Sequence, residues 1–98
     1  MKLAKIFAQS VGYAHHIKGI IMEKKLQNAF TKGLGLSPPI DFPSLAFARS
    51  EGWDSIAHMK LIAAIEEEFG IMMDTDDVLA LSSYPVAIDI VKKYAAFP

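Results

Sequence analysis

The chain has 98 residues, of which 52% are hydrophobic and 21% are charged, and its formal net charge is −1. This length suits one small domain, the hydrophobic content is too high for intrinsic disorder, and every apolar run is too short to cross a membrane. There is no cysteine, which excludes disulfide frameworks, thiolate zinc sites and a thiol nucleophile of the chain's own. No continuous signal-peptide core opens the chain, so we expect a cytoplasmic protein.

Charge is divided unevenly along the chain. Residues 1–49 carry seven Lys/Arg and two acidic residues, a balance of +5, whereas residues 50–98 carry three and nine, a balance of −6. The basic half has one arginine, and its lysines are scattered among aliphatic residues instead of forming a concentrated patch. We therefore do not expect a nucleic-acid partner.

Residues 1–18 are treated as an N-terminal extension, and residues 19–98 as the domain proper. Apolar residues spaced as on a short amphipathic helix occur in the extension at Leu3, Ile6, Phe7 and Val11. Two interpretations stay open. The extension is either an extra helix or loose tail on the domain, or an element for partner docking or membrane-surface contact, because Lys2, Lys5 and Lys18 favour anionic lipid.

For the first part of the domain, the sequence predicts a helix followed by a long loop. Apolar residues at 22, 26, 29, 30 and 34 follow one helical face, and the helix should end near Gly33 or Gly35. The segment "SPPIDFPSLAFARSEG" contains three prolines, which excludes a regular helix. We expect an ordered loop pinned by its own apolar residues, with Phe47 pointing inward; the candidate pins are Ile40, Phe42, Leu45 and Phe47.

A second helix is predicted from Ser55 to Phe69, with Gly70 as its C-terminal cap and Glu66, Glu67 and Glu68 on its far face. Its apolar residues recur at three and four positions, at Ile56, Met59, Ile62, Ile65 and Phe69.

Two further helices complete the fold. A short helix should open at Asp74 or Thr75, and Ser83 should cap a last helix in which Pro85 falls in the first turn. The stripe expected to be buried in this last helix consists of Ala87, Ile88, Val91 and Tyr94. Because no segment alternates with period two, we predict an all-α fold, a small bundle of three main helices plus one short helix and a long ordered loop.

Ser55 allows two interpretations. It is either a helix cap or a residue to which a group is attached, and Asp54 could provide the same cap one position earlier, which would leave Ser55 free. A serine hydrolase is not expected, because His58 projects from the same helix and no third group orients it. His15 and His16 are adjacent and make a poor metal pair, so all three histidines are expected on the surface and no metal site is predicted.

The stretch "GWDSIAHMKLIAAIEEEFGI" resembles the phosphopantetheine attachment region of acyl carrier proteins, whose usual pattern is Asp-Ser-Leu followed by a leucine-rich helix ending in Glu-Glu-x-Phe. Further matches lie at "LGL" (34–36), at Phe47 and at "VAIDIV" (86–91). Residues 22 to 94 follow the family pattern without a gap.

The resemblance implies a carrier and not an enzyme. A phosphopantetheinyl transferase would move 4'-phosphopantetheine from coenzyme A onto Ser55 as a phosphodiester, and acyl groups would travel on this arm as thioesters between acyl-loading and acyl-transfer enzymes. Asp54 would position the hydroxyl, and the expected partner-binding residues are Ile56, Met59, Lys60, Glu66 and Glu67. We expect a monomer in lipid, cell-envelope or secondary-metabolite biosynthesis. A peptidyl or aminoacyl carrier, and an unmodified interaction domain of the same fold, remain as alternatives.

Three features depart from the family pattern: Ile56, Lys60 and the added N-terminal extension, residues 1–18. Ile56 replaces leucine, a change that conserves volume, and Lys60 stands where the family typically carries an acid. Trp53 is reminiscent of stand-alone carriers in specialised pathways, although it is equally consistent with simple packing against the loop. Lys60 predicts partners other than the general fatty-acid enzymes.

Overall fold

The computed structural model describes residues 19–94. Residues 19–34 are helical and are followed by the short 3-10 helix η1 (Phe42–Ser44) and the helices α2 (Ser55–Phe69), α3 (Thr75–Ala80) and α4 (Tyr84–Tyr94). Within this range the only β pairing is an isolated bridge between Ala46 and Ser83, which confirms the all-α prediction. No helix in residues 19–94 is long and apolar enough to cross a membrane. The amphipathic helix predicted in residues 1–18, and with it His15 and His16, lies outside the described residues.

The first helix ends at the second of its two candidate glycines. Gly35 has a φ of 63°, and the Leu36 amide donates to the Thr31 carbonyl at 3.0 Å, the pattern of a left-handed C-terminal cap. Gly33 is still helical and serves another purpose. A Cβ atom there would lie 2.5 Å from the Leu61 Cα atom, so the first helix and α2 approach each other too closely at this position for a larger residue.

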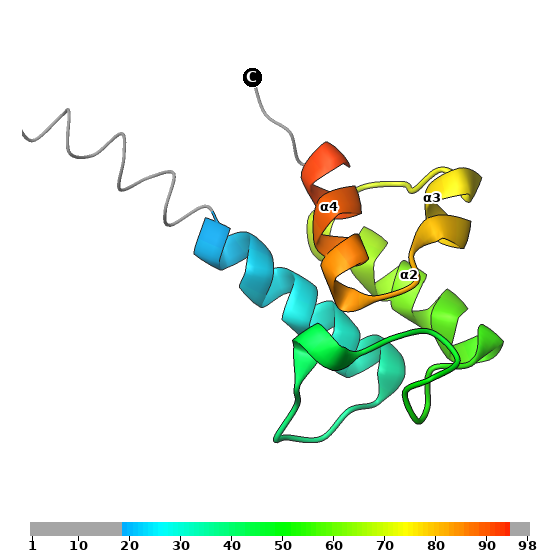
Figure 1. Cartoon of the computed structure of the whole chain (residues 1–98). Helices are drawn as coiled ribbons and strands as arrows, with labels where there is room; N and C mark the ends of the chain where they lie inside the picture. Colours follow the sequence, from blue (N-terminus) through cyan, green and yellow to red (C-terminus); the bar gives the residue numbers. More distant parts are fainter. Residues whose placement is uncertain (1–18, 95–98) are drawn as a thin grey trace, which may run out of the picture.

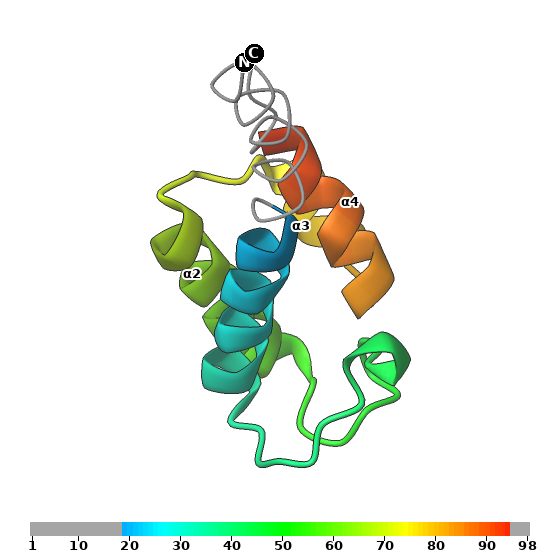
Figure 2. The same cartoon turned by 90° about the vertical axis from the view of Figure 1, so that its left-hand side faces the viewer.

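The first helix and α2 run antiparallel, and α4 packs beside them (Figures 1 and 2). Lys32 Nζ lies 3.4 Å from the Glu67 carboxylate, and Lys25 Nζ lies 5.9 Å from the centre of the Phe69 ring, so the first helix faces the end of α2. Both views place the loop between the first helix and α2 at one end of the bundle. The loop leads directly into the start of α2.

The core is built by the first helix, α2 and α4, together with Trp53 from the loop and with Met73 and Leu81 on either side of α3. Phe30 contacts both Trp53 and Tyr84 edge-on, with ring centres 5.5 and 5.2 Å away. The largest fully buried side chains are Trp53, Phe30, Leu26, Leu61, Ile65, Leu81 and Val91. Trp53 is therefore the aromatic residue that anchors the loop in the interior.

The apolar residues that recur along α2 divide into a buried group and an exposed group. Ile62 and Ile65 are buried, whereas Ile56 and Met59, which were expected to bind partners, are 72% and 58% exposed. The face turned inward is instead completed by Leu61 and, in the first turns, by the half-buried polar residue His58. In α4 the buried stripe differs from the predicted one. Ile90 is buried, whereas Ile88, which was predicted to be buried, is only half-buried.

The loop is pinned as predicted by Phe42 and Leu45, which pack against the core. The inward orientation predicted for Phe47 is wrong, because its side chain is 37% exposed. Trp53 occupies the interior position, and the Phe47 ring covers it from outside, edge-on at 6.3 Å. The Phe47 amide donates to the Ser82 carbonyl at 2.9 Å, and the Tyr84 amide donates to the Leu45 carbonyl at 3.1 Å, so the loop is also tied to the start of α4.

Candidate functional site

At the start of α2, the two residues that could have capped the helix have different roles. Asp54 is the cap, because its Oδ1 atom accepts from the Ala57 amide at 2.8 Å and its carbonyl accepts from the His58 amide at 2.8 Å. Ser55 is the first helical residue, is exposed, and makes no side-chain hydrogen bond within residues 19–94. The redundancy expected from the Asp-Ser pair is thus real, and the Ser55 hydroxyl is free.

The surroundings of this hydroxyl suit a phosphodiester. Among the described residues, the amides of Ser55 and Ile56 have no hydrogen-bond acceptor, since Asp54 occupies those of Ala57 and His58. Free first-turn amides and the helix dipole favour negative charge at a helix N-terminus. An exposed hydroxyl beside such amides fits a covalently attached group that carries a phosphate.

His58 is not the surface residue that the sequence predicted. It is half-buried, its Nδ1 atom accepts from the Trp53 indole N–H at 3.0 Å, and its Nε2 atom lies 2.8 Å from the Val78 carbonyl oxygen. Both ring nitrogens are therefore engaged, and His58 is not free to act as a base for Ser55. No sequence rule pairs residues 58 and 78, so only the fold could show this contact.

The predicted partner-binding residues divide into two groups along α2. Ile56, Met59 and Lys60 are exposed within the first two turns, close to Ser55 along the helix. Glu66 and Glu67 are eleven and twelve residues beyond Ser55, which is about 17 Å along the axis at about 1.5 Å per residue. Glu66 is half-buried and accepts from the Met73 amide at 2.9 Å, whereas Glu67 is exposed and pairs with Lys32. The structure thus gathers only the first group around Ser55.

Comparisons with known proteins place the chain in a family. A family model described as a phosphopantetheine attachment site matches residues 24–85. An acyl carrier protein of Nitratidesulfovibrio vulgaris strain DP4 is 36% identical over 70 residues, which are 71% of this chain and 92% of that protein. The chain belongs to the acyl carrier protein family. A second member, from Cyanidium caldarium, is 31% identical over 68 residues, which are 69% of this chain and 79% of that protein. No solved structure matches the chain significantly.

Membership in the family establishes the cofactor and the general kind of partner. The protein carries covalently attached 4'-phosphopantetheine, as the resemblance implied, and interacts with a phosphopantetheinyl transferase and with enzymes that handle acyl groups. When bound, this arm supplies the thiol that the chain, with no cysteine, does not contain. Carriers of this kind are generally not catalytic themselves.

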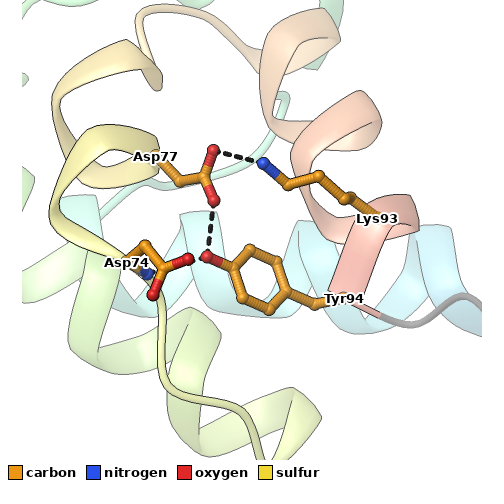
Figure 3. A network of polar contacts seen from close by, with 4 residues as sticks. All are labelled: Asp74, Asp77, Lys93 and Tyr94. Atoms are coloured by element: carbon orange, nitrogen blue, oxygen red, sulfur yellow. Dashed lines mark hydrogen bonds and ion pairs between the residues drawn. The ribbon is translucent and has the colours of Figure 1, made fainter.

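In this carrier, a polar network joins α3 to the end of α4 (Figure 3). The only buried residue of α3 is Asp77, whose carboxylate receives the Lys93 ammonium at 2.6 Å and the Tyr94 hydroxyl at 2.5 Å. The Tyr94 oxygen in turn accepts from the Asp74 amide at 2.7 Å. The hydrogen bonds from Lys93 and then from Tyr94 hold the pKa of Asp77 below its ordinary value, and the same bonds raise the pKa of Lys93 and Tyr94.

Proposed function

We propose that Ser55 is the residue that carries 4'-phosphopantetheine, and that the protein holds acyl intermediates on this arm as thioesters during lipid, cell-envelope or secondary-metabolite biosynthesis. The observation that supports the proposal is that Asp54 and Ser55 have different roles at the start of α2. Asp54 provides the cap, so Ser55 presents an exposed hydroxyl with no partner among the described residues.

The attachment breaks the phosphoanhydride bond of coenzyme A and forms a phosphoester bond to the serine. A bond forms between Ser55 Oγ and the phosphorus that bears the pantetheine part of coenzyme A, the bond from that phosphorus to the adenosine bisphosphate part breaks, and the hydroxyl proton passes to a base of the transferase. The chain contributes the position of the hydroxyl and the free amides of Ser55 and Ile56. Asp54 uses Oδ1 for the cap, which leaves Oδ2 available for contact with the transferase.

Ser83 supplies a matched control for this assignment. It also precedes a helix, but its hydroxyl oxygen accepts from the Val86 amide at 3.2 Å. The intact mass of the wild type should rise by one phosphopantetheine after incubation with coenzyme A and a promiscuous transferase. Ser55→Ala should not change in mass, whereas Ser83→Ala should gain the arm. A mass gain in Ser55→Ala would show that the arm is attached elsewhere.

The proposed partner surface consists of Ile56, Met59 and Lys60. Two exposed apolar side chains next to the attachment point favour docking, because their burial by a partner releases water from apolar surface. Lys60 places a positive charge on this surface, and an enzyme adapted to an acidic carrier would meet it with its own positive charge. Specialised partner enzymes are therefore proposed. Glu67 extends the surface at the far end, where Lys32 partly neutralises it, and Glu66 contributes less because it is engaged by the Met73 amide.

The carrier is proposed to act as a cytoplasmic monomer. Successive enzymes must reach the same face around Ser55, and a dimer that covered Ile56 and Met59 would block them.

A further inference from the structure

Trp53 determines where the start of α2 lies. It stands two residues before Ser55, is 1% exposed, and packs against Phe30 in the core. Its amide donates to the Ser50 carbonyl at 3.2 Å, and its carbonyl accepts from the Ala48 amide at 2.9 Å. The end of the loop and the start of the helix are therefore both held by one buried residue.

The indole N–H of Trp53 is a buried donor, and its acceptor is His58. An indole nitrogen only donates and a backbone carbonyl only accepts, so the two partners determine the form of the imidazole. His58 Nδ1 carries no proton and accepts from Trp53 at 3.0 Å, while His58 Nε2 carries the proton and donates to the Val78 carbonyl at 2.8 Å.

The imidazole thereby joins three segments that meet near Ser55. It belongs to the first turns of α2, contacts the end of the loop through Trp53, and contacts α3 through Val78. Its ring lies nearly parallel to the indole, at an interplanar angle of 16°, and the Phe47 ring covers it edge-on at 5.3 Å. Among the residues of α3, Val78 also packs partly against the core, so the hydrogen bond from His58 adds a polar contact at a residue that already holds α3 to the domain.

We propose that His58 is a positioning residue for Ser55, and that its bond to the Trp53 indole keeps the Trp53–Ser55 segment in the arrangement that the transferase recognises. This inference rests on the proposed attachment at Ser55. Without an acceptor the buried indole N–H is unsatisfied, and the segment shifts among positions that expose it to water. A transferase that binds one arrangement then encounters only a fraction of competent carrier, so the KM for the carrier rises while kcat changes little.

Two substitutions of His58 test the two hydrogen bonds of the imidazole one at a time. His58→Asn places an amide oxygen near the position of Nδ1 and keeps an acceptor for Trp53, but it does not reach Val78. His58→Gln places an amide nitrogen near the position of Nε2 and keeps a donor for Val78, but it leaves the indole without its acceptor. The pair is well matched, because both variants replace the ring with a neutral amide and each keeps one contact.

The experiment is a steady-state measurement of phosphopantetheine transfer from coenzyme A to the full-length apo carrier, at a temperature where circular dichroism shows every variant folded. We expect the KM of His58→Gln to rise about fivefold, as loss of one hydrogen bond implies, and that of His58→Asn to stay within about twofold of the wild type. In a Trp53→Phe background, which has no indole donor, His58→Gln should add no further increase. Nitrogen NMR shifts of His58 should show an unprotonated Nδ1 in the wild type.

The outcomes separate this inference from the proposed function. If peptide mapping places the arm of the wild type on a residue other than Ser55, the proposed function fails. If the arm is on Ser55 but the Asn and Gln variants have equal KM values, or kcat falls instead of KM rising, the positioning role of His58 is refuted. A protonated Nδ1 in the folded carrier would refute it independently.

Discussion

Replacing Gly33 by alanine tests the close approach between the first helix and α2, the helix that carries Ser55. The new Cβ atom would lie 2.5 Å from the Leu61 Cα, 3.0 Å from its amide nitrogen and 3.2 Å from its Cβ. Two of these three atoms are backbone atoms in the interior of α2, so no side-chain rotation relieves the clash. The two helices must move apart.

Two opposing effects determine how much Gly33→Ala changes the free energy of unfolding. Overpacking a well-filled interior typically costs about 1–3 kcal/mol, and a contact with backbone belongs at the upper end of this range. Alanine is more favourable than glycine inside a helix by about 1 kcal/mol. We therefore expect Gly33→Ala to lower the free energy of unfolding by about 2 kcal/mol, measured by urea denaturation of the apo protein followed by circular dichroism.

Two other glycines provide controls for the two effects. Gly19 is helical, and a methyl group added there would meet no atom of residues 19–94 within 4 Å, so Gly19→Ala should raise the stability by up to about 1 kcal/mol. Gly35 is equally open but has a φ of 63°, so Gly35→Ala should lose about 1–2 kcal/mol from backbone strain alone. If Gly33→Ala proves as stable as the wild type or more so, the two helices do not cross as closely as the structure shows.

Two further predictions concern charge. Because the Lys93 and Tyr94 bonds lower the pKa of Asp77 below its ordinary value of 3.8, its ionised form stabilises the fold above that value, and this contribution is lost as the pH falls through the lowered pKa. Asp77→Asn should therefore lose stability at pH 7 and show a weaker decline in acid, measured as urea midpoints across pH; an unchanged acid profile would argue against the network. Lys60→Glu should improve acyl transfer by a general fatty-acid enzyme at low salt and much less at high salt. Equal rates throughout would place Lys60 outside the interface.

The sequence alone determined the features that depend on neighbouring residues. The bounds of α2 and its end at Gly70 follow from the helical spacing of apolar residues and from the left-handed conformation that glycine allows, and both were confirmed. The family pattern around Ser55 is local in the same sense, because an attachment site read from one helix start needs no distant contact to be recognised. Local rules left the cap open between Asp54 and Ser55, and the structure assigns it to Asp54, which leaves the Ser55 hydroxyl exposed.

Tertiary structure decided the features that depend on residues far apart in the chain. Gly33 and Gly35 are equivalent by local rules, and only the approach of Leu61 shows that the first is a helix contact and the second a helix end. Likewise, Trp53 takes the interior position predicted for Phe47, and its indole N–H has an acceptor in His58, which in turn bonds to Val78 twenty residues away. A buried polar group is tolerated only where a partner exists, and the position of that partner is a property of the folded chain.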